Sequence, residues 1–213
     1  MDLYQFHALT SKLEEIPLPG LEAQLKMAPA FRTAFAEHLS PPPKDSKIAA
    51  VLLLLFPTAT DDLNFVLIRR PAYNGTHAKQ ISFPGGKAEP QDRSLWETAL
   101  RETQEEVGVE KTGVQLIRAL TPTYIPPSNF LVHPYVGLCT QTPNFIAEEK
   151  EVEEILYISL ADLMNDAHET FGWVSPSYAG KVEVPVYNFD TLEVWGATAM
   201  MLSEFKHLMR LAK

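Results

Sequence analysis

The sequence has few cysteines, few positive charges and no long apolar run. Cys139 is the single cysteine, so the chain cannot form an internal disulfide, and a reducing compartment is expected. We therefore expect a cytoplasmic protein in which Cys139 is a buried strand residue. The longest apolar run covers residues 48–56, far short of the roughly 20 residues that a membrane helix needs.

Positive charge is scarce. The 18 Lys and Arg residues stand against 27 Asp and Glu residues, which gives a formal net charge of −9. This balance disfavours a broad surface for nucleic acid or for an anionic membrane, but it allows a local basic pocket for a small anion. Apolar residues make up 46% and charged residues 21% of the 213 residues, as in ordinary globular proteins.

The first part of the chain is predicted to be helical. Apolar residues recur at helical spacing behind Asp2, a candidate N-cap. A second helix is expected over residues 21–39, with a kink or break at Pro29. A proline-rich segment at residues 40–45 then separates a helical extension, residues 1–45, from a domain at residues 46–213. The extension packs on the domain, dimerises with a second copy or shapes the pocket, and the sequence does not choose among these roles.

The remaining pattern predicts an α+β domain. Residues 48–56 form a continuous apolar run of strand length, which is typical of a strand buried on both faces. Further strands are predicted at residues 64–68, 116–120, 130–138, 152–158 and 182–187, and helices at residues 95–107 and 197–211. Because strands and helices do not alternate regularly, a layered α+β fold is favoured over a doubly wound sheet.

The helix at residues 95–107 is unusually acidic. Ser94 and Glu97 have the spacing of a capping box, and Gly108 suits the left-handed C-terminal position. A helical wheel gives a core face and an opposite, acidic face; the core residues are Trp96, Leu100, Thr103 and Val107, and the acidic ones are Glu102, Glu105 and Glu106. The acidic face is either a solvated surface or, beside the Gly85-Gly86 turn, a site for a hard cation.

The stretch that begins at Gly86 resembles the Nudix box, Gly-x5-Glu-x7-Arg-Glu-U-x-Glu-Glu-x-Gly-U, where U is aliphatic. Residues 101–109 read Arg-Glu-Thr-Gln-Glu-Glu-Val-Gly-Val and match its second half, with Thr103 at an aliphatic position. Gly86 matches the opening glycine. Asp92 stands where the first glutamate belongs, and one additional residue lengthens the gap before Arg101 to eight.

The flanking segments resemble the coenzyme A pyrophosphatase branch of that family. The branch has His-x-Gly-Gln ahead of Phe-Pro-Gly-Gly; here residues 77–80 read His-Ala-Lys-Gln and residues 83–86 read Phe-Pro-Gly-Gly. Residues 192–199, Leu-Glu-Val-Trp-Gly-Ala-Thr-Ala, are similar to the closing Ile-Trp-Gly-Leu-Thr-Ala of the branch. The resemblance covers about residues 48–211.

The resemblance implies a Nudix fold, an α/β/α sandwich with a mixed sheet. It also implies a metal-dependent hydrolase that cleaves the diphosphate of coenzyme A or its thioesters to 3′,5′-ADP and (acyl-)4′-phosphopantetheine, with Mg²⁺ or Mn²⁺ as cofactor. Metal ligands are expected from the box, namely Gly86, Glu102, Glu105 and Glu106. Arg101 would orient the carboxylates, and a simple helix salt bridge is the alternative.

Other site residues follow less directly. Nudix enzymes differ in their general base; Glu151, in the acidic run at residues 148–154, is the candidate, and a solvated turn is its alternative. Five polar residues are candidates for binding the substrate's phosphates, with ordinary surface charge as the alternative: Arg69, Arg70, His77, Lys79 and Gln80.

Two other functions are weighed against coenzyme A hydrolysis. The first keeps the Nudix chemistry with another nucleoside diphosphate derivative, such as ADP-ribose or NADH. The second is a Nudix-fold binding module without catalysis, which is disfavoured because all three carboxylates of the box are present. In each case the expected partner is a small molecule rather than nucleic acid or a membrane.

Overall fold

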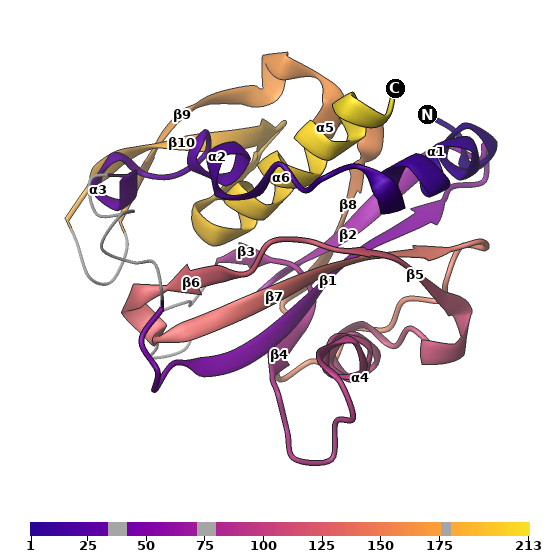
Figure 1. Cartoon of the computed structure of the whole chain (residues 1–213), viewed down its shortest axis with the longest axis horizontal. Coiled ribbons are helices and arrows are strands. Elements are labelled where there is room, and N and C mark those ends of the chain that lie inside the picture. Colours follow the sequence, from indigo (N-terminus) through magenta and orange to yellow (C-terminus); the bar gives the residue numbers. More distant parts are fainter. Residues whose placement is uncertain (34–41, 72–79, 176–179) are drawn as a thin grey trace.

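A mixed β-sheet runs through the middle of the molecule (Figure 1). The computed structural model describes residues 1–33, 42–71, 80–175 and 180–213. Strand β1 (Lys47–Pro57) is central, and it pairs in parallel with β7 (Phe130–Cys139) from Lys47 opposite Phe130 to Leu55 opposite Leu138. The other strand pairs of this sheet, within the described residues, are antiparallel. The sheet is therefore mixed, as expected.

Strand β1 has two different neighbours along one edge. The main strand order is β3 (Ile81–Ser82), β2 (Leu63–Arg69), β1, β7 and β5 (Val114–Ala119). Residues 55–57 of β1 pair with β2, whereas residues 49–51 pair with β4 (Gly85–Lys87). Strand β6 (Thr123–Ile125) adds to β7, and β8 (Glu154–Ser159) adds to β2. This split places the Gly-Gly segment of β4 beside the first half of the central strand.

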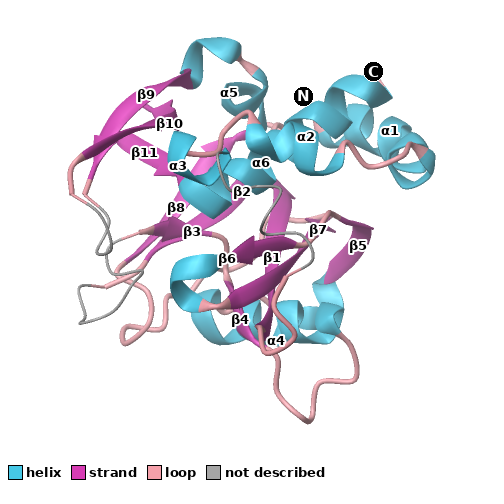
Figure 2. Cartoon of the chain, turned by 60° about the vertical axis from the view of Figure 1, so that its left-hand side comes forward, coloured by secondary structure: helices cyan, strands magenta, loops and turns pink. Residues whose placement is uncertain are grey.

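Helices cover both faces of the sheet (Figure 2). Helix α4 (Leu95–Val107) lies on one face, while α1 (Leu3–Glu15), α2 (Gly20–Leu25) and α6 (Gly196–Ala212) lie on the other. An antiparallel three-stranded sheet stands beside α6 and is made of β9 (Glu169–Val174), β10 (Val182–Phe189) and β11 (Leu192–Trp195). Short helices and 3-10 turns complete the chain: α3 (Ala30–Thr33), α5 (Leu160–Met164), Lys111–Gly113, Pro126–Ser128 and Asp166–His168. The α/β/α sandwich is thus confirmed.

The core lies in two layers separated by the sheet. Alternate residues of β1 serve the two layers: Leu53 and Leu55 join the cluster under α6, and Leu52 and Leu54 join the cluster under α4. All four are buried, which explains why the strand reads as a continuous apolar run. The prediction of a strand buried on both faces is confirmed, and Cys139 at the end of β7 is buried as expected.

Local signals at helix ends behave mostly as predicted. Helix α4 begins after Ser94, whose hydroxyl accepts a hydrogen bond from the Glu97 amide at 3.2 Å, and it ends at Gly108, with φ of 75°. The capping box is incomplete, because the Glu97 carboxylate accepts from the Arg93 amide instead of the Ser94 amide. Asp2 caps α1 with a complete capping box that includes Gln5.

The second predicted helix of the extension is wrong in extent. Helix α2 ends at Leu25 and α3 begins only at Ala30, directly after Pro29, where the break was expected. Residues 34–39 of that prediction lie outside the described residues. Helix α1 packs on the domain, because its Phe6 and Leu13 are buried in the same cluster as Phe205 of α6. The division at residue 45 stays a prediction. No helix of the described chain is long and apolar enough to cross a membrane.

Candidate active site

Glu106 is buried between helix α4 and strand β4. Its side chain is 1% exposed. One carboxylate oxygen accepts from the Gly85 amide at 2.8 Å, and the other accepts from the Arg70 guanidinium at 3.0 Å. Arg70 also donates to the Gly85 carbonyl at 3.0 Å. The wheel placed Glu106 away from the core, which is wrong, because β4 covers the acidic side of the helix as the sheet covers the other.

Glu102 and Glu105 differ in their environments. The Glu102 side chain is 14% exposed and stands against Gly86, where a Cβ atom would fall 2.5 Å from the carboxylate. Glycine at position 86 is therefore needed for this close approach. The Glu105 side chain is 58% exposed. The three glutamates of the box thus range from fully buried to largely solvated.

Arg101 connects the acidic helix to the loop that precedes it. Its guanidinium donates to both oxygens of Asp92, at 2.9 and 3.0 Å, to Glu102 at 2.9 Å and to Glu105 at 3.0 Å. A further bond reaches the Lys87 carbonyl at 3.0 Å. These hydrogen bonds hold the pKa of Asp92 far below its ordinary value. Asp92, which replaces the first glutamate of the box, therefore makes a bidentate pair with Arg101 despite the longer gap.

Two carboxyl groups of the site are poorly stabilised as anions. Burial raises the pKa of Glu106 to about 7, and neither Arg70 nor the Gly85 amide offsets the lost hydration. Burial also raises the pKa of Glu102, against the opposing effect of Arg101. The charge of Glu151 raises the pKa of both, so this residue lies close to them.

The acidic run that carries Glu151 is hydrogen-bonded to the end of α4. The Glu148 amide donates to the Glu106 carbonyl at 3.0 Å, and the Ile146 amide donates to the Val107 carbonyl at 3.0 Å. The Glu151 side chain is exposed. The fold therefore brings the segment that carries the candidate general base against the end of α4, although the two are more than 40 residues apart in the chain.

The donor set suits a divalent cation. Glu102 and Glu106 are oxygen ligands whose negative charge is only partly offset, and the Glu102 carboxylate lies directly against the backbone of Gly86. Among the described residues, no three His, Cys, Asp or Glu side chains gather closely enough to form a complete cage. A cation such as Mg²⁺ would therefore complete its shell with water or with substrate oxygens.

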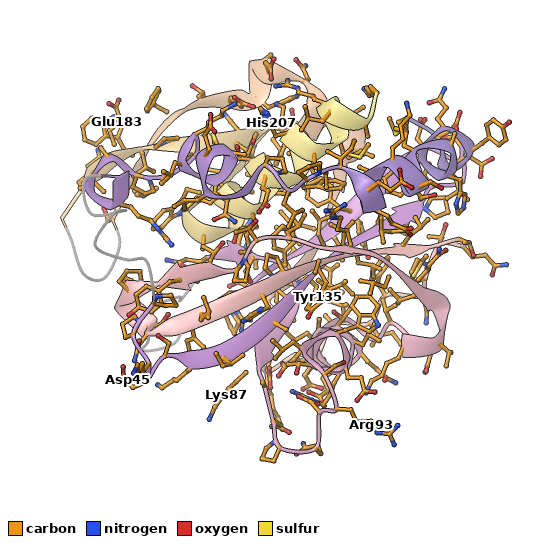
Figure 3. All side chains as sticks on the ribbon, in the orientation of Figure 1. Asp45, Lys87, Arg93, Tyr135, Glu183 and His207 are labelled. Atoms are coloured by element: carbon orange, nitrogen blue, oxygen red, sulfur yellow. The ribbon has the colours of Figure 1, made fainter. Side chains whose placement is uncertain are left out.

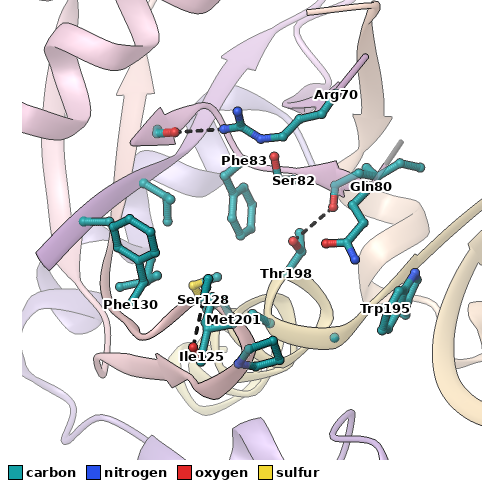
Figure 4. Close-up of a pocket in the computed structure, with 18 of the residues that line it drawn as sticks. Arg70, Gln80, Ser82, Phe83, Ile125, Ser128, Phe130, Trp195, Thr198 and Met201 are labelled. Atoms are coloured by element: carbon teal, nitrogen blue, oxygen red, sulfur yellow. Dashed lines mark hydrogen bonds between the residues drawn. The ribbon is translucent and has the colours of Figure 1, made fainter. Parts of the chain in front are cut away.

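A cavity of about 580 Å³ adjoins the acidic site (Figure 4). Strand β4 forms their common wall, because Gly85, Gly86 and Lys87 also line the cavity. Much of the remaining lining is apolar; it includes Phe83, Ile125, Phe130, Trp195 and Met201. Arg70 lies at one side of the cavity in Figure 4. The site thus joins an apolar chamber to a cluster of carboxylates.

The structure separates the predicted substrate-binding residues. Arg70 and Gln80 line the cavity beside β4. Arg69, the last residue of β2 and the one before Arg70, pairs with Glu154 at 3.0 Å and lines a second, polar cavity of about 410 Å³. His77 and Lys79 lie outside the described residues. Successive residues of an extended chain point to opposite faces of a sheet, which explains why the side chains of Arg69 and Arg70 line different cavities.

Sequence reasoning missed two kinds of lining residue. Thr198 donates a hydrogen bond to the Ile81 carbonyl at 3.1 Å, so the closing motif meets the segment before the box; their shared likeness to one family branch was a usable signal. Pro29 and Arg32 also line the cavity, although they belong to the helical extension. No local pattern marks them, since only the fold brings them within reach.

The pH dependence of stability should reveal the buried Glu106 carboxyl. Burial raises the pKa of Glu106 from 4.5 in the unfolded chain to about 7 in the folded state. Below pH 4.5 the carboxyl group is neutral in both states, so the folded protein has its full stability there. As the pH rises from 4.5 through about 7, the carboxyl group ionises more readily in the unfolded chain, and this stability is lost. We expect Glu106→Gln in EDTA to become more stable than the wild type by about 3 kcal/mol over this interval. Urea denaturation at several pH values measures the difference; a difference that stays constant would contradict the assignment.

The comparisons with known proteins agree with this geometry. Residues 46–176 match the model of the NUDIX domain. The Nudix hydrolase NudL of Yersinia enterocolitica is 35% identical over 160 residues, which cover 74% of this chain and 79% of that protein. The peroxisomal coenzyme A diphosphatase ndx-8 of Caenorhabditis elegans is 32% identical over 155 residues, covering 72% of this chain and 64% of the worm protein.

A solved structure supports the fold. The Nudix hydrolase RenU of M. smegmatis superposes with a TM-score of 0.54 at 12% identity, covering 78% of this chain and 87% of that one. At this identity the likeness concerns the fold alone. The domain match and the relatives carry the family assignment. The chain therefore belongs to the Nudix hydrolase superfamily, and it is an enzyme that acts on diphosphate anhydrides.

Proposed function

We propose that this enzyme hydrolyses the diphosphate of coenzyme A or of its thioesters, and releases 3′,5′-ADP and (acyl-)4′-phosphopantetheine. The observation that carries the proposal is the cavity that adjoins the carboxylates of the Nudix helix. Its lining, within the described residues, includes the cations Arg32, Arg70 and Lys87 and no Asp or Glu, in a chain with a net charge of −9. A cavity of this kind suits an anionic substrate with a long apolar portion.

The relatives support the choice of substrate class. The worm protein is named a coenzyme A diphosphatase. The motifs on both sides of the box in this chain resemble those of the same branch. The apolar wall that includes Phe83, Phe130 and Met201 is suited to the pantetheine arm or to a base. The basic rim at Arg70 and Lys87 is suited to phosphate groups.

Nudix hydrolases generally use divalent metal ions, and we propose Mg²⁺ or Mn²⁺ on Glu102, Glu105, Glu106 and the Gly86 carbonyl. When bound, the ion would offset the charge of the diphosphate and lower the pKa of a bound water. Arg101 holds two of these carboxylates in place through its fork of donors. Glu151, which lies near Glu102 and Glu106, is the proposed general base.

The proposal is tested by assaying the purified protein with coenzyme A, acetyl-coenzyme A, ADP-ribose and NADH. With Mg²⁺ or Mn²⁺ we expect the two coenzyme A compounds to yield 3′,5′-ADP and the matching phosphopantetheine on anion-exchange chromatography. Addition of EDTA should abolish turnover, and excess metal should restore it. Turnover of ADP-ribose or NADH, with coenzyme A left intact, would contradict the proposed substrate, although the protein would still be a Nudix diphosphatase.

A further inference from the structure

The helical extension forms part of the wall of the substrate cavity. Pro29 and Arg32 both line the cavity. Both precede residue 46, where the match to the NUDIX domain begins. The cavity is therefore completed by a segment that the domain itself does not contain.

The extension is fastened to the domain by a buried carboxylate. Glu204 of α6 is fully buried. It accepts hydrogen bonds from the Gln24 amide group at 2.8 Å, from the Thr121 hydroxyl at 2.6 Å and from the Gly20 amide at 3.3 Å. Since α2 carries Gly20 and Gln24, these bonds hold the helix against both α6 and the segment at Thr121.

Gln24 continues the connection towards the cavity wall. Its side chain donates to the Thr121 carbonyl at 2.9 Å and accepts from the Thr123 hydroxyl at 3.0 Å. Strand β6, which contains Thr123, leads directly into the lining residues Ile125, Pro126, Pro127 and Ser128. The extension and this wall therefore form one hydrogen-bonded unit.

Arg32 is held at the same wall. Its guanidinium donates a hydrogen bond to the Tyr124 carbonyl, immediately before Ile125. Figure 4 shows Ile125 across the cavity from Arg70. Arg70 is engaged with Glu106 and the Gly85 carbonyl at the acidic side. The two arginines therefore mark opposite sides of one chamber.

We propose that Arg32 binds a phosphate monoester that the substrate carries away from its diphosphate. This assignment rests on the proposed function, in which Arg70 and the carboxylates take the diphosphate. The planar guanidinium fork is the side chain best matched to a phosphate, and Arg32 stands at the wall of a cavity whose described lining includes Arg70 and Lys87 and contains no Asp or Glu. For coenzyme A this group is the 3′-phosphate of the ribose, so Arg32 determines specificity for 3′-phosphorylated substrates.

The kinetic test compares coenzyme A with 3′-dephospho-coenzyme A. We expect Arg32→Gln to lower kcat/KM for coenzyme A roughly ten- to hundredfold, the effect of losing a charged hydrogen bond, and to change kcat/KM for the dephospho compound less than threefold. Arg32→Lys should recover part of the preference. Lys26→Gln is the matched control, because it removes one positive charge from the same extension and its ammonium faces His207 at 3.2 Å. Equal losses on both substrates would overturn the assignment.

A binding test separates this assignment from the proposed activity. Calorimetry with 3′,5′-ADP and with AMP requires no hydrolysis. We expect the wild type and Lys26→Gln to bind 3′,5′-ADP at least tenfold more tightly than AMP, and Arg32→Gln to lose this preference. If coenzyme A is not hydrolysed but the preference depends on Arg32, the proposed function fails and the phosphate site stands. If Arg32→Gln keeps the wild-type preference, or the wild type has none, the phosphate site fails.

Discussion

Glu106→Gln is expected to lower kcat for diphosphate hydrolysis about a thousandfold while the protein stays folded. Glu106 is the most buried carboxylate of the acidic helix, and its pKa is raised by that burial. A glutamine can still accept from the Gly85 amide, but it lacks the negative charge that a divalent cation requires. The same change should stabilise the metal-free protein at neutral pH, so lost activity cannot be ascribed to unfolding.

Glu110→Gln is the matched control for this experiment. Glu110 is exposed just after the end of α4, and the change removes one negative charge near the helix without touching the buried site. It should keep kcat within threefold of the wild type. Initial rates with Mn²⁺ at saturating substrate measure both variants. A folded Glu106→Gln protein with wild-type turnover would exclude Glu106 as a metal ligand.

Arg101→Ala should lower the free energy of unfolding by about 3–5 kcal/mol. Arg101 and Asp92 have side chains that are 12% and 6% exposed, so the change leaves a buried carboxylate without its cation. Glu102 loses a partner at the same time, and the Lys87 carbonyl loses a donor. The loop between β4 and α4 is thereby released, and turnover should fall together with stability.

Urea denaturation of Arg101→Ala, Arg101→Lys and Arg93→Ala at neutral pH tests this expectation. Lysine keeps the charge but not the fork, so its stability should be intermediate. Arg93 is exposed and extends away from the fold where the same loop leads into α4 (Figure 3), and its replacement should cost less than 1 kcal/mol. An Arg101→Ala protein as stable as Arg93→Ala would show that the Asp92 pair contributes little.

The pH profile gives an independent signature of the same pair. Arg101 lowers the pKa of Asp92 from its ordinary 3.8, so the stabilisation is present above that pH and is lost as the pH falls towards the lowered value. This acid-side loss should be smaller in Arg101→Ala. It is opposite in sign to the effect of Glu106, whose stabilisation declines on the alkaline side.

The elements that were predicted well carry their signals within a few residues. Helix α4 has a serine cap before it and a left-handed glycine after it, and its predicted bounds are those observed. Strand β1 is indicated by a continuous apolar run of strand length, the pattern of a strand buried on both faces. The acidic second half of the box follows the same rule, because one helix holds its residues at fixed spacing.

The elements that were missed depend on distant partners. Strand β4 is Gly-Gly-Lys, a composition with little strand preference, and it is a strand only because residues 49–51 of β1 lie beside it. The burial of Glu106 follows from that pairing, so a wheel drawn on the helix alone gave the wrong environment. The extent of α2 was misjudged because helical spacing in residues 21–39 does not reveal where the chain turns to meet α6.

By itself the sequence determined the family, the layered class of fold and the acidic residues of the box, because each depends on residue types and on their spacing over short stretches of the chain. Only the tertiary structure decided which carboxylates are buried, that Asp92 completes the Arg101 pair, and that Arg32 of the extension reaches the cavity wall. These properties depend on hydration lost and charges brought together by packing. The loss of hydration and the pairing of charges both arise only when residues far apart in the chain come into contact.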